Sequence, residues 1–133
     1  MKALTLWQPY AGAIAQRLKH FETRSWPTKY RGLILIHASV KPLTNERIQL
    51  AERYHIDTTL KGEIVAIARL DDCILMTPEF IQQQSPTELA LGDWRVGRYA
   101  WQLSDIRRPP APIKISGKQG LWTFYGSPLN DKG

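Results

Sequence analysis

A continuous apolar run, GLILIHASV from Gly32 to Val40, constrains most strongly what this chain can fold into. The run is short, is rich in branched side chains and lies between Gly32 and Pro42, a pattern that favours a strand over a helix. Side chains of a strand alternate between its two faces, and here both faces are apolar. The sequence therefore predicts a strand that is buried on both sides.

The remaining segments predict a mixture of short strands and short helices. Strands are expected over residues 3–7, 21–26, 63–70, 98–103 and 120–125, and helices over 9–19 and 44–55 and after Pro78 and Pro86. Strands and helices do not alternate regularly, which disfavours a doubly wound fold. We predict the α+β class: a small, mostly antiparallel β-barrel with short helices around it.

The first helix is predicted to begin at Pro9, because the missing N–H of proline is no loss in a first turn. Tyr10, Ile14 and Leu18 would form its single apolar stripe, so the helix is expected to end near Leu18. A later helix start, Ser85-Pro86-Thr87-Glu88, has the pattern of a capping box.

The sequence has 133 residues, a formal net charge of +6 and one cysteine. These values predict one cytoplasmic domain over residues 1–133, without a disulfide and without a membrane partner. The charge is concentrated, since residues 1–31 hold one acidic side chain and six basic ones: Lys2, Arg17, Lys19, Arg24, Lys29 and Arg31. Such asymmetry favours a polyanionic partner, and a solvated surface without a partner is the alternative.

The sequence lacks the motifs of several enzyme classes. It contains no glycine-rich phosphate loop and no GxSxG nucleophile elbow. Its histidines and Cys73 do not have the spacing of metal ligands. The adjacent acid pair Asp71-Asp72 is expected in a solvated turn after a strand. We therefore predict neither a metal ion nor a cofactor.

One constellation, from Lys19 to Trp26, combines charges with aromatic rings. In an extended segment Glu22, Arg24 and Trp26 share one face, which places a carboxylate between two cations and beside an indole. Lys19 and Arg24 are predicted to bind a phosphate or a base carbonyl, and an ionised Glu22 to position them. A surface salt-bridge cluster of little energy is the alternative. The rings predicted to stack on a base are Trp7, Tyr10, Trp26 and Tyr30.

His37 lies in the middle of the apolar run, and Ser39 shares its face. One interpretation is a hydrogen-bonded core histidine, and the other is a pair of residues at the mouth of a cavity. Trp101, Trp122 and Phe124 are predicted to belong to the core.

Several blocks of the sequence resemble the ASCH domain (the ASC-1 homology domain) of stand-alone bacterial or phage proteins. The blocks are LTLWQPYA, KHFETR, SWPTKYRG, LILIHAS, GDWRVGRYAW and GKQGLW, which cover most of the chain from Ala3 to about Phe124. Gln8, in the first block, is counted among the candidate binding residues. Lys19, Glu22 and Arg24 match the family motif GxKxxExR. Arg17 replaces the glycine of this motif and is expected to add charge to the cleft.

This resemblance implies a β-barrel similar to the RNA-binding PUA domain, with Lys19, Glu22 and Arg24 at the base of a cleft beside the barrel. Some members of the family are enzymes: one branch deacetylates N4-acetylcytidine, and another is reported to cleave RNA. In the amidohydrolase branch a threonine takes the position of Glu22, and the catalytic acid comes from a later strand, for which Glu63 is the candidate. The catalytic set that the resemblance suggests is therefore Lys19, Glu22 and Glu63.

We expect a module that binds RNA, a nucleotide or a modified nucleobase. The alternatives from other functional classes are a metal-independent hydrolase and a protein-interaction module. A pocket sized for one base would favour modified-nucleoside chemistry, whereas an open groove would favour the binding of a strand.

Overall fold

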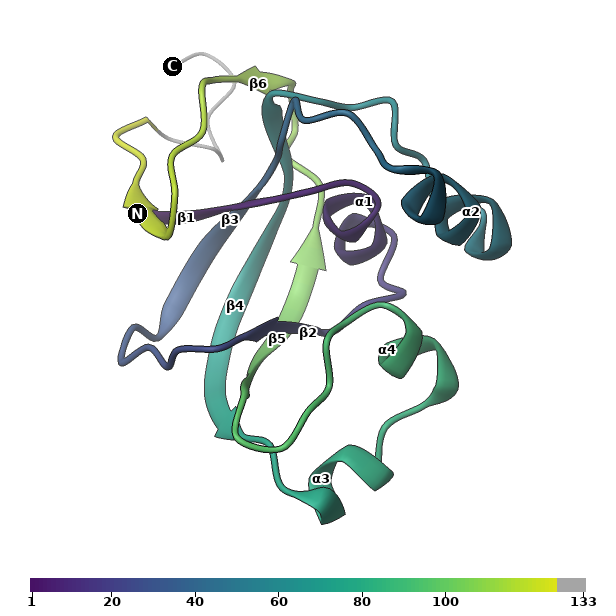
Figure 1. Ribbon diagram of the computed structural model, residues 1–133. Helices are drawn as coiled ribbons and strands as arrows, with labels where there is room; N and C mark the ends of the chain where they lie inside the picture. The colour runs from purple at the N-terminus through teal and green to yellow at the C-terminus, as the bar shows by residue number, and fades with distance from the viewer. Residues whose placement is uncertain (127–133) are drawn as a thin grey trace.

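A curled sheet packs against one short buried helix in the computed structural model, which describes residues 1–126 (Figure 1). The strands of this part of the chain are β1 (Lys2–Leu6), β2 (Phe21–Arg24), β3 (Gly32–Ala38), β4 (Glu63–Leu75), β5 (Tyr99–Arg107), β6 (Ile113–Lys114) and β7 (Leu121–Thr123). Its helices are α1 (Tyr10–Ala15), α2 (Asn45–Tyr54), α3 (Pro78–Gln82) and α4 (Pro86–Ala90). The predicted α+β class is confirmed.

The sheet has the strand order β2-β5-β4-β3-β1-β7, and β6 pairs with the start of β4. Neighbouring strands of the sheet run antiparallel, except β1 and β3, which run parallel. Shifts of register in β4, at Ile67–Arg69 and Leu70–Asp72, bend this long strand and curl the sheet into a half-barrel. The pair Asp71-Asp72 thus lies inside a bulged strand, and the prediction of a turn was wrong.

The apolar run forms β3 and is buried on both faces, as predicted. Ile34 and Ile36 pack into the cluster around α1, while Leu35 packs into a second cluster with Trp122 and Phe124. Burial of apolar side chains on both faces is the main stabilising contribution to such a strand. The two clusters fix β3 in the middle of the sheet, beside the strand that leads into the candidate site.

Helix α1 is shorter than predicted and is enclosed on all sides. It ends at Ala15 because the chain enters a left-handed turn at Arg17, whose φ is 63°. The Leu18 N–H donates to the Ala13 carbonyl across this turn, as in a Schellman motif. The prediction of one apolar stripe extending to Leu18 was wrong, since residues 11–15 are all buried.

The other helices begin where the sequence predicts. The hydroxyls of Thr44, Thr77 and Ser85 accept a backbone N–H at the starts of α2, α3 and α4. The predicted capping box of α4 is half formed, because Ser85 caps the helix but the Glu88 carboxylate bonds to another element. That diverted carboxylate helps to build the candidate site.

Candidate nucleic-acid interface

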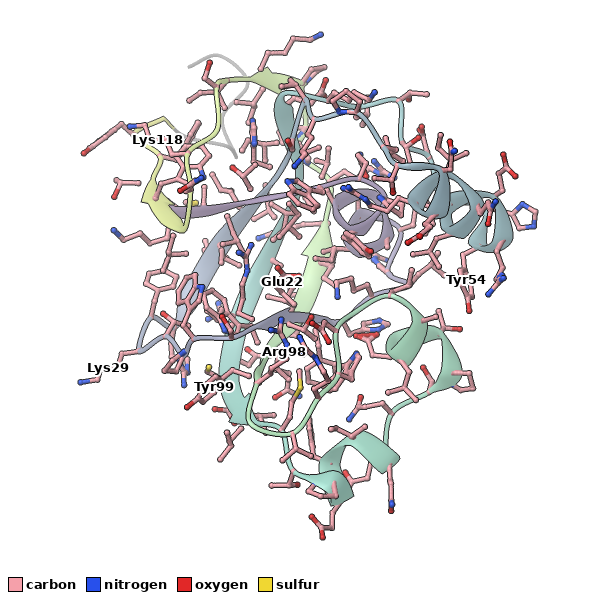
Figure 2. The ribbon with its side chains drawn as sticks, in the orientation of Figure 1. Glu22, Lys29, Tyr54, Arg98, Tyr99 and Lys118 are labelled. Carbon is pink, nitrogen blue, oxygen red and sulfur yellow. The ribbon has the colours of Figure 1, made fainter. Side chains whose placement is uncertain are left out.

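A cleft of about 1400 Å³ lies beside the curled sheet, bounded by β1, β2 and residues 114–120. Eight of the candidate residues line it: Trp7, Tyr10, Lys19, Glu22, Arg24, Trp26, His37 and Ser39. Figure 2 shows Glu22 near the centre of the molecule, and Lys118, from residues 114–120, near its edge. The fold thus brings together side chains that are far apart in the sequence.

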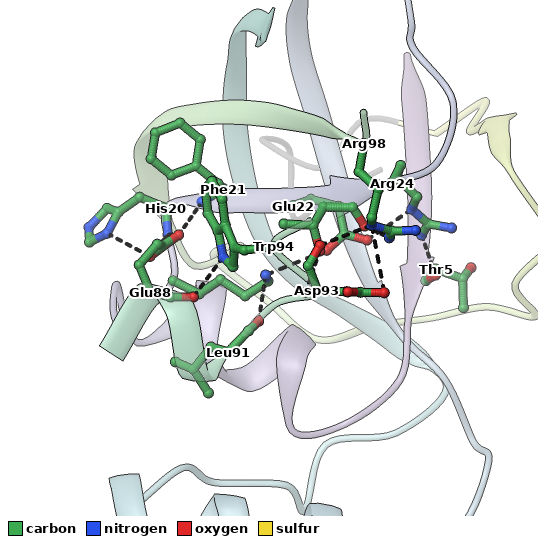
Figure 3. Close-up of polar contacts among 12 residues, drawn as sticks. Thr5, His20, Phe21, Glu22, Arg24, Glu88, Leu91, Asp93, Trp94 and Arg98 are labelled. Atoms are coloured by element: carbon green, nitrogen blue, oxygen red, sulfur yellow. Dashed lines mark hydrogen bonds and ion pairs between the residues drawn. The ribbon is translucent and has the colours of Figure 1, made fainter. Parts of the chain in front are cut away.

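Lys19, Glu22 and Arg24 form a charged group at the base of the cleft, which we call the floor cluster (Figure 3). Lys19 is 1% exposed, and its Nζ donates to the Leu91 carbonyl at 2.6 Å. Burial lowers the pKa of the Lys19 ammonium, and the carboxylates of Glu22 and Glu88 oppose this shift. Lys19 is therefore a buried cation at the base of the cleft.

The Glu22 carboxylate lies between the two cations of the floor cluster. Its Oε1 is 3.8 Å from Lys19 Nζ, and its Oε2 is 2.9 Å from Arg24 Nε. The Arg24 Nε–H does not point at this oxygen, so the contact is an ion pair and not a hydrogen bond. Only 9% of the Glu22 side chain is exposed. A nearly buried carboxylate at the base of a cleft favours a ligand that brings N–H donors.

A second buried carboxylate, that of Glu88, fixes the strand that carries the floor cluster. It accepts the backbone N–H groups of His20 and Phe21 at 2.8 to 3.1 Å (Figure 3). Helix α4 is thereby held beside the start of β2, which brings the Leu91 carbonyl to Lys19. The capping-box pattern gave no signal of this role, because it directs Glu88 toward its own helix.

Arg98 and Asp93 also line the cleft, and the candidate residues did not include them. Arg98 Nε donates to the Asp93 carbonyl at 2.9 Å, and Arg98 Nη2 donates to the Thr23 carbonyl at 3.4 Å. The Asp93 carboxylate accepts from Arg95 Nε at 2.7 Å, and hydrogen bonding from Arg95 holds the pKa of Asp93 below its ordinary value. These residues belong to the block GDWRVGRYAW. The resemblance of this block to the ASCH domain is the feature of the sequence that could have identified them.

His37 connects β3 to residues 114–120. Its Nε2 is 2.6 Å from the Ile115 carbonyl, which can only accept, so Nε2 carries the proton. Nδ1 then accepts from the Thr5 hydroxyl at 3.2 Å, and burial lowers the pKa of the ring. A Cβ on Gly117 would lie 2.5 Å from Thr5 Oγ1, so this segment packs tightly on the pair. His37 is thus a hydrogen-bonded histidine that also lines the cleft.

Trp26 is the aromatic residue of the cleft best placed to stack on a base. It is 36% exposed, and its ring packs edge-to-face on Trp101 with centroids 4.9 Å apart. Arg24 Cζ is 5.8 Å from the Trp26 ring, so a stacked base would also meet a cation. Tyr10 lies deeper, with its ring 6.0 Å from Lys19 Nζ.

Three candidate residues do not line the cleft. Gln8 binds backbone on two segments, donating to the Leu60 carbonyl and accepting the Gly12 N–H. The Tyr30 hydroxyl donates to a backbone carbonyl in β3, and its ring packs against the core. Glu63 is buried at the start of β4. The later acid that the hydrolase hypothesis requires is therefore outside the cleft lining.

The cleft is basic, but residues 1–31 supply only part of its charge. Two acidic side chains and five basic ones line it, the basic ones being Lys19, Arg24, Arg98, Lys114 and Lys118. Only the first two of these belong to residues 1–31. Arg17 instead donates to the Ile106 carbonyl at 3.0 Å and does not line the cleft, so the expectation that it adds charge there was wrong.

The curled half-barrel sheet with short helices around it is consistent with a PUA-like barrel. The family model of the ASCH domain matches residues 4–108, and the chain belongs to this family. ASCH domains have a PUA-like fold and are generally linked to RNA binding. A search of the curated proteins finds no match for the chain. Within residues 1–126, no helix is both long enough and apolar enough to cross a membrane.

The backbone at Arg17 gives a physical reason for the glycine of the motif GxKxxExR. This position has φ of 63°, which glycine adopts without the steric cost that other residues meet. The turn places Lys19 two residues later, inside the protein. Residues 114–120, which complete the cleft, lie beyond the matched range.

Proposed function

We propose that this ASCH domain binds single-stranded RNA in the cleft. The observation that carries the proposal is the combination of a volume of about 1400 Å³ with basic side chains in excess of acidic ones. Pockets for small ligands typically enclose roughly 300–1,000 Å³. The cleft therefore exceeds what one nucleobase needs, which favours a strand over a single modified nucleoside.

The surroundings of each lining residue indicate its role. Phosphates of the strand are contacted by the cations that face the cleft: Arg24, Arg98, Lys114 and Lys118. Trp26 stacks on one base, and Glu22 accepts an N–H from a base edge. Lys19 does not touch the strand, because it is 1% exposed and its Nζ is bound to the Leu91 carbonyl, and it positions the Glu22 carboxylate.

Fluorescence anisotropy with a labelled oligouridine of roughly 12 nucleotides tests this proposal, over a series of salt concentrations. The variant Lys114→Ala/Lys118→Ala removes two exposed cations of the cleft. Each phosphate contact in a single strand contributes about 0.7 to the slope of log affinity against log salt, so the slope is expected to fall by about 1.4. A DNA oligonucleotide of the same length measures the contribution of the 2′-hydroxyl.

The matched control is Arg53→Ala/Arg107→Ala, which removes the same charge from exposed residues outside the cleft. We expect its salt slope to equal that of the wild type. The proposal is wrong if the wild type does not bind the oligonucleotide at low salt, or if both double variants change the slope equally.

One observation favours a second function, the hydrolysis of an acylated cytidine or of RNA. Burial lowers the pKa of the Lys19 ammonium, and a lysine with a lowered pKa can act as a general base. The Leu91 carbonyl holds a proton of this amine at 2.6 Å, so Lys19 would first have to release that contact. Incubation of the protein with N4-acetylcytidine and with labelled RNA tests this function, and the absence of turnover on both substrates would exclude it.

A further inference from the structure

A second basic surface begins where the cleft ends, at Trp7. This residue lines the cleft and is 47% exposed. Lys41 Nζ lies 3.9 Å from the centroid of its ring, and Arg47 Cζ lies 4.3 Å from it. We call Trp7, Lys41 and Arg47 the rim patch. Its residues come from the position just after β1, the segment after β3 and the first turn of α2, so only the fold brings them together.

Both cations of the rim patch retain their capacity to bind an anion. Among residues 1–126, neither Lys41 nor Arg47 is within ion-pair distance of a carboxylate. Arg47 Nε donates to the Thr44 hydroxyl at 3.2 Å, whereas Arg47 Nη1 is a buried nitrogen without a hydrogen-bond partner in this part of the chain. Glu46 is the acid next to Arg47 in sequence, and it pairs with neither cation. An oxyanion at this surface would accept from Lys41, which is exposed and has no carboxylate partner among these residues.

The rim patch adjoins the cleft. Trp7 and Tyr10 both line the cleft, and Trp7 contacts the two cations of the rim patch. Val40, which precedes Lys41, also lines the cleft. A strand held in the cleft can therefore reach the rim patch along one continuous surface, which includes the exposed Val40 side chain.

The contacts of Trp7 also change its predicted role. A ring that carries two cations within 4.3 Å of its centroid is not free to stack on a base unless one of them leaves. Its attraction for Lys41 and Arg47 instead holds two flexible side chains at the ring, which lowers the entropic cost of binding anions beside it.

We propose that the rim patch binds the phosphodiester backbone of an RNA strand where the strand leaves the cleft, with Trp7 holding Lys41 and Arg47 in place. This inference rests on the proposed function, and it adds a second contact region. It predicts that the rim patch strengthens the binding of long strands and has no effect on strands short enough to lie within the cleft.

The test uses oligouridines of roughly 4 and roughly 12 nucleotides, which bracket the site sizes of many single-strand-binding domains. The variant Lys41→Gln/Arg47→Gln removes both charges and keeps polar side chains. For the long strand its salt slope is expected to fall by about 1.4, since two phosphate contacts are lost. For the short strand, affinity and slope are expected to match the wild type. Arg53→Gln/Arg107→Gln is the control of equal charge.

Each outcome has a distinct meaning. If the wild type binds neither strand, the proposed function fails and the rim patch fails with it. If the wild type binds the long strand but the double variant keeps its salt slope, only the rim patch is wrong. An equal loss on both strands would place these cations inside the cleft and overturn the inference. So would a loss in Trp7→Ala without a loss in the double variant, because that result indicates stacking of a base on Trp7.

Discussion

Two carboxylates of the cleft have the same kind of neighbours in different surroundings. Glu22 lies between Lys19 and Arg24, and Asp93 lies beside Arg95 and Arg98. The Glu22 side chain is 9% exposed, whereas that of Asp93 is 47% exposed. The two clusters therefore differ mainly in how much water reaches them.

Judged by distance alone, the Arg95–Asp93 contact would stabilise the fold more than the Lys19–Glu22 contact. Burial reverses this order. Arg95 Nε is 2.7 Å from Asp93 Oδ1, while Lys19 Nζ is 3.8 Å from Glu22 Oε1. Water screens the shorter contact, so its loss changes stability little. The longer contact joins two groups that have lost most of their hydration, and removal of Lys19 leaves the buried Glu22 carboxylate with Arg24 alone. Burial shows better than contact distance which charges the fold depends on.

The largest expected effect comes from removing the buried cation. Lys19→Met keeps the length of the side chain and removes its charge, which leaves Glu22 with one partner and the Leu91 carbonyl without a donor. Breaking a buried pair in this way typically costs about 3–5 kcal/mol of the free energy of unfolding. Urea denaturation of the variant and the wild type measures this loss.

Arg95→Ala is the matched change in the exposed cluster, and its denaturation midpoint is expected to coincide with that of the wild type. If Arg95→Ala destabilises the protein as much as Lys19→Met does, burial does not decide which of the two ion pairs stabilises the fold.

A smaller effect is expected at the turn that places Lys19 inside. Arg17 has φ of 63°, and its side chain donates to the Ile106 carbonyl. Arg17→Ala and Arg17→Gly both remove that hydrogen bond, but only glycine relieves the left-handed strain. We expect the glycine variant to be more stable than the alanine variant by about 1 kcal/mol. Thermal or urea denaturation of the pair checks this, and equal stability would contradict the Schellman turn.

The smallest effect is expected in acid, at the exposed carboxylate. Hydrogen bonding from Arg95 lowers the pKa of Asp93 below its ordinary value of 3.8. The unfolded chain therefore takes up this proton first as the pH falls, so the stabilisation from Asp93 is present above about pH 4 and declines below it. The difference in stability between the wild type and Asp93→Asn should stay constant from pH 7 to about pH 5 and shrink below about pH 4. A difference that changes between pH 5 and 7 would contradict this assignment.

Local features were predictable where neighbours in sequence decide the structure. The continuous apolar run of residues 32–40 predicted a strand buried on both faces, and the threonine and serine caps predicted the helix starts. The alternation of Glu22, Arg24 and Trp26 predicted that they share a face, and all three line the cleft. The length of α1 was not predictable from its stripe, because a left-handed residue ended it.

Roles that depend on distant segments were not predictable. Gln8 and Tyr30 looked like ligand-binding residues, yet both use their polar atoms on nearby backbone. Glu88 looked like a helix cap, yet it binds the start of a strand 67 residues earlier in the chain. The Leu60 carbonyl and the Phe21 N–H, which Gln8 and Glu88 bind, are 52 and 67 residues away in the chain, whereas Tyr30 binds the Leu33 carbonyl three residues on.

The sequence by itself determined the elements, the buried strand and the motif that marks this chain as an ASCH domain, because these depend on spacing along the chain. Only the tertiary structure decided how its charges are used. The curl of the sheet placed Lys19 inside, Arg17 against the Ile106 carbonyl, and Arg98, Lys114 and Lys118 around the cleft. The physical reason is that the contribution of a charge depends on its access to water and on its partners, and both are set by segments far away in the sequence.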